Sequence, residues 1–248
     1  LLSPEAAADL VDTLDLHVAV DAVRLLPPRA VANMVEALES DRAAELLREL
    51  TPAEREGILS LVSPDQASLL RTLLDWPDES VAAHMVPEVL TVSDQVSAAE
   101  AIEQVRNHRA KLRQDSHIGA YVFAVDATNR LLGVVSFREL VLADADRPVR
   151  DLVEEDVITV GPLVDQEEAA RTLTKHRLLA IPVVDEDNHL LGVLTADDAS
   201  DIAEEEATED AERQGGSEPL EVPYLRASPF LLWKKRIVWL LVLFLAAA

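Results

Sequence analysis

The sequence contains no cysteine, which excludes disulfide bonds and thiolate metal sites. Only 7 of the 248 residues are glycine, and the sequence has no P-loop, GxSxG or HExxH motif, so it offers no support for an enzyme. The 6 histidines show no HxxxH spacing, which argues against a zinc site. Basic residues are also few. With 22 Lys and Arg against 46 Asp and Glu, the net charge is −24, so cations or a basic protein are better partners than nucleic acid.

The acids are concentrated in one stretch, residues 196–212 (ADDASDIAEEEATEDAE), which has no Lys or Arg. In a helix, alanines would line one face of this stretch and carboxylates another. Two carboxylates about 6 Å apart repel by roughly 3 kcal/mol at an effective dielectric constant near 20, so divalent cations that prefer oxygen would stabilise the helix. A solvated acidic face is the alternative. The carboxylate face would hold Asp198, Asp201, Glu205, Glu209 and Glu212.

A repeat marks the first 80 residues, where Leu or Val recurs every 12 positions from Leu2 to Leu74. Three of these positions are followed by a helix-start signal, Ser3-Pro4, Thr51-Pro52 or Ser63-Pro64, with a capping residue before a proline. The repeat predicts one short helix per 12 residues and an all-α superhelical domain over residues 1–80.

From residue 81 the pattern changes to alternating strands and helices, and it is duplicated. Residues 89–92 (VLTV) recur as 157–160 (VITV), and 131–136 (LLGVVS) recur as 190–195 (LLGVLT). Each half also has a helical stretch, 98–106 or 166–176, and a turn with Asp or Asn between its last two strands. We predict two half-repeats, 81–149 and 150–203, that pack their sheets together, with a flexible polar insert at 107–117.

The sequence ends in an apolar run, 237–248, which is shorter than the roughly 20 residues that span a bilayer. Lys234, Lys235 and Arg236 precede the run, and Trp233 and Trp239 flank this cluster. This order predicts the start of a membrane helix at 229–248 that is entered from the cytoplasmic side, after a connecting segment at 204–228. The alternative is a hydrophobic helix docked on the protein. Since the chain opens with Leu1, we expect a fragment cut at both ends.

The half-repeats resemble CBS motifs, and the order of parts resembles the cytosolic region of MgtE-type magnesium channels and transporters. The most specific stretches are 131–140 (LLGVVSFREL), 165–171 (DQEEAAR), 204–210 (EEEATED) and 233–240 (WKKRIVWL). The resemblance implies an α+β multidomain fold: an all-α helical superhelix domain, a tandem CBS (Bateman) α/β domain, an acidic connecting "plug" helix and the start of a transmembrane helix.

The resemblance also implies a function. The chain would be the cytosolic magnesium-sensing region of an MgtE-like channel or transporter, which closes the pore when intracellular magnesium is high. It would not be an enzyme. It would form a homodimer at the cytoplasmic side of the cell membrane, and its other partner would be the membrane domain of the same protein.

Magnesium sites follow from the same resemblance, since the family binds Mg²⁺ between the helical domain, the CBS pair and the plug helix. Arg177 stands where the family uses an acid, so a fixed guanidinium would replace one ion's charge there. The matching carboxylates are Asp9, Asp41, Glu45, Asp165, Glu167, Asp198, Asp201, Glu206, Glu209 and Asp210.

A nucleotide site is implied as well. Residues 136–139 (SFRE) and 195–198 (TADD) resemble the element with which CBS motifs hold a ribose. Tyr121 would face an adenine, Arg138 a phosphate and Glu139 the ribose, with ATP as the second ligand. Leu178 stands where the family offers an aromatic side chain to the base.

Three other functions remain open. An adenine-nucleotide-sensing CBS module would bind ATP with no effect of divalent ions on compactness. A regulator of an enzyme would need a catalytic domain outside this sequence. A structural adaptor would bind neither ligand.

Overall fold

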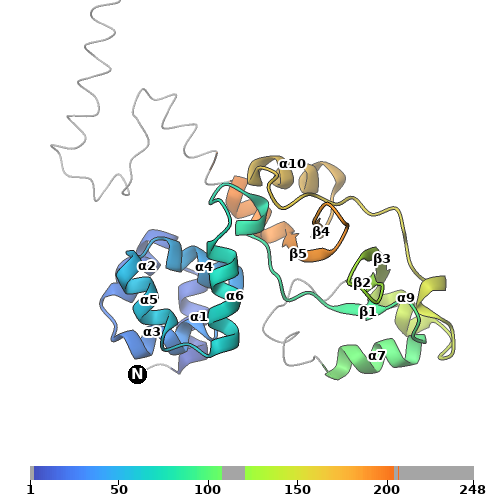
Figure 1. Ribbon diagram of the computed structural model, residues 1–248, viewed down its shortest axis with the longest axis horizontal. Coiled ribbons are helices and arrows are strands. Elements are labelled where there is room, and N and C mark those ends of the chain that lie inside the picture. The colour runs from blue at the N-terminus through green and yellow to red at the C-terminus, as the bar shows by residue number, and fades with distance from the viewer. Residues whose placement is uncertain (1–2, 108–120, 204–205, 207–248) are drawn as a thin grey trace, which may run out of the picture.

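The computed structural model describes residues 3–107, 121–203 and 206 (Figure 1). The predicted insert from residue 108, the connecting segment apart from Glu206 and the predicted membrane-helix start lie outside these residues. Within the described ranges, no helix is long and apolar enough to cross a membrane.

The N-terminal helical domain begins a new helix every 12 residues, as the repeat predicts. The odd-numbered helices pack on one another in sequence, and so do the even-numbered ones, which gives two stacked rows (Figure 1). Local signals set the helix starts, because Pro opens four of them and Thr51 forms a capping box with Glu54. The helices are α1 (Pro4–Asp12), α2 (Leu16–Arg24), α3 (Pro28–Val35), α4 (Ser40–Arg48), α5 (Pro52–Leu59) and α6 (Pro64–Leu74).

The two half-repeats follow a short linker helix, η1 (Val81–Ala83). The first contains β1 (Thr91–Ser93), α7 (Ala98–Asn107), β2 (Tyr121–Val125), β3 (Leu131–Ser136) and α9 (Phe137–Leu142), and η3 (Val149–Asp151) comes after it. Its sheet has the order β1-β2-β3, with β1 parallel to β2 and β2 antiparallel to β3. The second contains α10 (Gln166–His176), the antiparallel pair β4 (Ala180–Val184) and β5 (Leu190–Thr195), and a helix at 196–203.

The strand predicted at 157–160 is reduced to a single parallel bridge between Val160 and Val183. In the first half-repeat, the equivalent ladder extends further because the Phe123 N–H donates to the Leu90 carbonyl at 2.8 Å. Pro182 occupies the equivalent position in the second half-repeat and has no N–H to donate, so the ladder stops there.

Each half-repeat begins with an extended segment that pairs with the last strand of the other. Val86 exchanges backbone hydrogen bonds of 2.8 and 2.9 Å with Val193 in β5, and Glu154 exchanges bonds of 2.9 and 3.0 Å with Val134 in β3. Gly133 makes room for this crossing, because a Cβ there would lie 2.3 Å from the Glu154 carbonyl oxygen. The two half-repeats are therefore interlocked.

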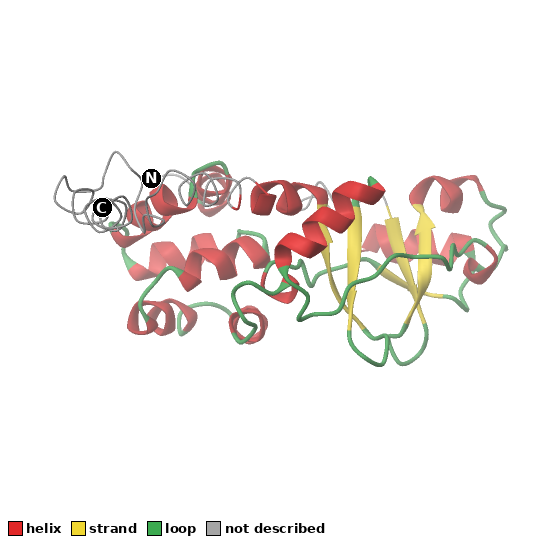
Figure 2. Cartoon of the chain, turned by 90° about the horizontal axis from the view of Figure 1, so that it is seen from above, coloured by secondary structure: helices red, strands yellow, loops and turns green. Residues whose placement is uncertain are grey.

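The hairpin turns of the two half-repeats lie side by side (Figure 2). The Leu131 N–H donates to the Asn188 carbonyl at 2.9 Å, and the Leu190 N–H donates to the Asn129 carbonyl at 3.0 Å. Both asparagines have left-handed backbone conformations, with φ of 65° and 66°. The turns thus meet through a pseudo-twofold contact.

Buried apolar side chains form a cluster that runs from the helical domain through the linker into the second half-repeat. It includes Leu46 and Leu70 of the helical domain, Val81 and Ala82 of the linker, and Leu194 of β5. The first half-repeat has a separate cluster between its helices and its sheet. The helical domain therefore shares its core with the second half-repeat rather than the first.

Candidate cation site

Helix α4 brings a buried carboxylate to the junction between the helical domain and the second half-repeat. Asp41, in the first turn of α4, is only 9% exposed, and its Oδ1 atom has no hydrogen-bond partner among the described residues. Burial raises the pKa of Asp41 well above its usual range, and the charge of Asp198 raises it further. An unpaired carboxylate oxygen in this position is unfavourable unless it shares a proton or a cation.

Asp198 lies in the first turn of the helix at 196–203 and is half-buried. The Thr195 backbone N–H donates to Asp198 Oδ2 at 3.2 Å, and the Thr195 hydroxyl donates to the same oxygen. Burial raises the pKa of Asp198 to about 6; the hydrogen bonds from Thr195 oppose this shift, and the charges of Asp197 and Asp201 add to it. Asp198 therefore caps its own helix while it faces a second acid.

One guanidinium lies within this group of acids. The Arg42 side chain is 18% exposed, forms an ion pair with Glu45 and donates from Nη2 to the Leu14 carbonyl at 2.7 Å. Burial acts to lower the pKa of Arg42, but the charges of Glu45, Asp12 and Asp201 outweigh it, and the pKa is raised. We define the acidic junction as Asp41, Arg42, Glu45, Asp198 and Asp201.

The donors of the acidic junction suit a hard divalent cation. Carboxylate oxygens are its preferred ligands, and Mg²⁺ usually keeps several waters, so one or two carboxylates suffice. No three His, Cys, Asp or Glu side chains of the described ranges come together as a complete ligand set. Asp41 and Asp198 are the residues that would hold the ion, and water would complete its shell.

The other predicted ligands are placed differently. Asp165 caps α10 by accepting from the Glu167 N–H at 2.9 Å, and the Glu167 side chain pairs with Arg171. Asp9 is exposed on α1, and no hydrogen bond or ion pair links it to another described residue. Glu206 is helical, whereas Glu209 and Asp210 lie outside the described residues.

Arg177 does not take an ion's place in the described structure. It ends α10 with a left-handed backbone (φ 54°), and its exposed side chain forms no salt bridge within the described ranges. The Arg177 guanidinium, which was predicted to replace the charge of one ion, therefore has no carboxylate partner among the described residues.

Two hydrogen bonds of the Ser40 side chain were not expected from the sequence. The Ser40 hydroxyl donates to Glu88 Oε1 at 2.5 Å, and Gln66 Nε2 donates to the Ser40 hydroxyl at 3.2 Å. Glu88 precedes β1, so this contact joins α4 to the start of the first half-repeat. No sequence motif marks a pair 48 positions apart.

Arg48 holds the linker against the helical domain. Its guanidinium donates to the Leu73 carbonyl at 2.6 Å and to the Ala83 carbonyl at 2.9 Å, and its Nε lies 2.9 Å from Asp78 Oδ1. Arg48 follows Asp41 by two helical turns, so α4 carries both the candidate ligand and the contact with the linker.

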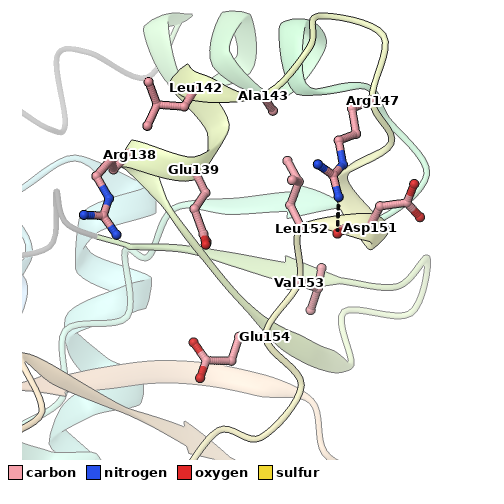
Figure 3. Close-up of a pocket in the computed structure, with 9 residues that line it drawn as sticks. All are labelled: Arg138, Glu139, Leu142, Ala143, Arg147, Asp151, Leu152, Val153 and Glu154. Atoms are coloured by element: carbon pink, nitrogen blue, oxygen red, sulfur yellow. Dashed lines mark hydrogen bonds between the residues drawn. The ribbon is translucent and has the colours of Figure 1, made fainter.

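A pocket of about 550 Å³ lies beside α9 (Figure 3). Arg138 and Glu139 of the predicted nucleotide site line it together with Arg147 and Glu154, whereas Tyr121 is not among its lining residues. Ser136 caps α9 by accepting from the Glu139 N–H at 3.2 Å. The motif at 136–139 is therefore a helix cap whether or not a nucleotide binds, and the spacing of Ser and Glu is the usual signal for one.

Comparison with known proteins agrees with this arrangement. The profile of the MgtE intracellular N domain matches residues 1–79, and the CBS domain profile matches residues 80–146 and 149–205. The crystal structure of the soluble part of a magnesium transporter is 33% identical, with a TM-score of 0.75 over 83% of this chain and 80% of that one. The chain belongs to the MgtE family. The predicted MgtE N domain and CBS pair are confirmed.

Comparison with individual MgtE proteins shows what share of their length this chain covers. The magnesium transporter MgtE of Thermus thermophilus is 32% identical over 185 residues, which are 75% of this chain but 40% of that transporter. The cytosolic domain of the Mg²⁺ channel MgtE, solved in complex with ATP, is 28% identical, with a TM-score of 0.75 over 82% of this chain and 81% of that one. In MgtE terms, the half-repeats are the CBS motifs, and the acidic junction lies between the N domain and the second CBS motif.

Proposed function

We propose that this chain is the magnesium-sensing regulatory region of an MgtE magnesium channel or transporter, on the cytoplasmic side of the membrane. Its role is regulatory rather than catalytic: it favours a closed pore when intracellular magnesium is high. The observation that carries the proposal is the unpaired, buried Oδ1 of Asp41 opposite Asp198. Family membership and the magnesium transporters among the relatives support it.

The acidic junction supplies the switch. Without a divalent ion, repulsion between Asp41 and Asp198 favours separation of the N domain from the second CBS motif. A bound Mg²⁺ supplies the positive charge that this pair lacks. An ion that binds only the closed form stabilises it by RT ln(1 + [L]/Kd), about 1.4 kcal/mol per site at tenfold Kd, so several weak sites together shift the equilibrium.

Small-angle scattering with and without millimolar MgCl₂ tests this proposal, with NaCl added to match ionic strength. We expect magnesium to reduce the radius of gyration of the wild type. The variant Asp41→Asn, Asp198→Asn, Asp201→Asn removes both the repulsion and the ligands, so its radius should not respond. A control that neutralises three exposed acids elsewhere, Asp65→Asn, Asp146→Asn and Glu186→Gln, should respond like the wild type. A wild-type radius that ignores magnesium, or follows NaCl equally, contradicts the proposal.

The pocket beside α9 supports a second function, adenine-nucleotide binding. Its volume of about 550 Å³ is within the usual range for small-molecule sites, and Arg138 and Arg147 offer charge to a phosphate. The MgtE cytosolic domain solved with ATP also supports nucleotide binding. Calorimetry with Mg-ATP should show binding that Arg147→Gln and Glu139→Ala weaken while the response to magnesium is unchanged. Absence of binding to the wild type would end this proposal.

We also propose a homodimer whose other partner is the membrane domain of the transporter. We expect this dimer from the resemblance to MgtE proteins, and the exposed Val141 and Leu142 on α9 offer apolar surface for it. Light scattering at tens of micromolar, with and without magnesium, should give the mass of a dimer. A strict monomer under both conditions contradicts it.

A further inference from the structure

We propose that Arg42 is a built-in counter-cation of the acidic junction, which holds part of the chain in the closed form without divalent ions and lowers the number of ions that closure needs. The inference rests on the proposed magnesium-sensing function, and it assigns to one fixed side chain a share of the charge that ions would otherwise supply.

The position of Arg42 supports this role. The guanidinium is held on the N-domain side by Glu45, one turn further along α4, and by the Leu14 carbonyl at 2.7 Å. Asp201 of the second CBS motif adds a smaller favourable charge interaction than Glu45 and Asp12 do, so the guanidinium interacts with carboxylates of both domains. Arginine stays protonated at every physiological pH, so this charge is present at any ion concentration.

A second observation shows that Arg42 does not satisfy the whole junction. Asp41 Oδ1, in the residue directly before Arg42, is buried and has no partner among the described residues. The four carboxylates and Arg42 carry a formal charge of −4 + 1 = −3, which one divalent ion reduces to −1. Without Arg42 the formal charge is −4 and one divalent ion leaves −2, so a second ion is needed before the residual charge falls to −1 or less. Arg42 therefore compensates part of the negative charge of the acidic junction, and a bound ion compensates a further part.

Because the sequence contains no cysteine, two introduced cysteines can carry spin labels without background labelling. Ser68→Cys on α6 and Thr174→Cys on α10 are exposed positions in the two domains. Pulsed electron paramagnetic resonance then measures the distance distribution between the two labels in the full chain, in EDTA and across a magnesium titration. Calorimetry gives the number of ions bound per chain.

We expect Arg42→Gln to raise the ratio of open to closed molecules in EDTA about tenfold. Magnesium should restore the wild-type closed distance, with about one more ion bound per chain. Arg42→Lys keeps the charge and should stay within about threefold of the wild-type ratio in EDTA. Arg71→Gln removes an arginine from an exposed pair with Glu56 and should leave both quantities unchanged. If Arg42→Gln does not fold, Arg42→Met, which keeps more of the apolar stem, replaces it.

The measurements in EDTA and in magnesium test the two proposals separately. A wild type that ignores magnesium contradicts the magnesium-sensing function, but the comparison of Arg42→Gln with wild type in EDTA still decides the role of Arg42. An unchanged open fraction in EDTA together with an unchanged ion count overturns the proposal. So does an Arg42→Lys variant that opens as far as Arg42→Gln, because the fork geometry rather than the charge would then be responsible.

Discussion

Asn129 and Asn188 each stabilise the hairpin turn to which the other belongs. Asn129 Nδ2 donates to the Leu190 carbonyl at 2.9 Å, and Asn188 Nδ2 donates to the Leu131 carbonyl at 2.7 Å. Each acceptor lies two residues after the opposite asparagine, so the two bonds are related by the pseudo-twofold axis of the CBS pair. Both residues also adopt the left-handed backbone that asparagine tolerates better than most.

Asn188→Ala should therefore lower the free energy of unfolding by about 2 kcal/mol, because it loses a hydrogen bond and places alanine in a left-handed conformation that asparagine tolerates better. Asn188→Gly relieves the backbone cost and should lose less. Urea denaturation measures both. The exposed neighbour Asp187→Ala should change the value by about 0.5 kcal/mol or less. Equal losses for Asp187→Ala and Asn188→Ala would contradict the role of the amide.

Substitution by alanine should change stability in opposite directions at two glycines. Gly133→Ala should destabilise the chain by several kcal/mol, at least about 3, because its Cβ would lie 2.3 Å from the Glu154 carbonyl and would separate the paired segments. Gly57→Ala, in α5 with no atom within 4 Å of the new Cβ, should stabilise it by about 0.5–1 kcal/mol. Thermal unfolding followed by circular dichroism separates the two. A loss at Gly57 as large as at Gly133 would contradict the expectation that the close approach of the Glu154 carbonyl sets the cost at Gly133.

Arg48→Met should lower the free energy of unfolding by about 2–4 kcal/mol. The side chain is 12% exposed, and its removal leaves the Leu73 and Ala83 carbonyls without their donor at the linker. Arg71→Met breaks an exposed ion pair and should cost about 1 kcal/mol or less. Urea unfolding of both variants provides the measurement, and similar losses for the two would mean that Arg48 does not hold the linker.

The raised pKa of Asp198 predicts how stability depends on pH. In the folded chain this pKa is about 6, above its ordinary value of 3.8, so the folded state binds the proton more tightly than the unfolded state does. The carboxyl therefore carries no penalty below about pH 4, and the penalty develops as pH rises through 6, reaching about 2–3 kcal/mol at pH 7.

Asp198→Asn removes this penalty while its amide oxygen can still accept from Thr195. In EDTA, the variant should match the wild type near pH 4 and exceed its unfolding free energy above pH 6. The comparison is made between variant and wild type because Asp126 and Asp185 titrate in the opposite sense, with pKa values lowered by hydrogen bonds. A difference that is the same at pH 4 and pH 7 would rule out a raised pKa as its cause.

The local features of the fold follow from the sequence. Five of the six helices of the N domain start at a proline or a capping aspartate, all six start at 12-residue intervals, and α10 occupies residues 166–176, the range that was predicted. The hairpins follow from Asn and Asp at their turns. These elements depend on neighbours along the chain, which a single sequence displays.

Selection among the predicted ligands depends on packing between distant elements. Asp41 and Asp198 meet because α4 packs near the helix at 196–203, whereas Asp165 is used to cap α10. The sequence shows ten candidate acids of one chemical type and no sign of which ones converge. It also presents Arg42 as an ordinary helix residue, since it gives no sign that Asp201 of the other domain acts on the Arg42 charge.

The apolar cluster that continues from Leu46 through Val81 to Leu194 has a consequence for cooperative unfolding. Amide hydrogens of the N domain and of the second CBS motif should exchange through one opening reaction, while those of helices α7 and α9, which pack on the separate core of the first CBS motif, exchange through another. The covalent order of the domains would then differ from the order in which they come apart. The strands of the first CBS motif remain interlocked with those of the second, so only its helices α7 and α9 are able to open alone while the N domain and the second motif remain joined.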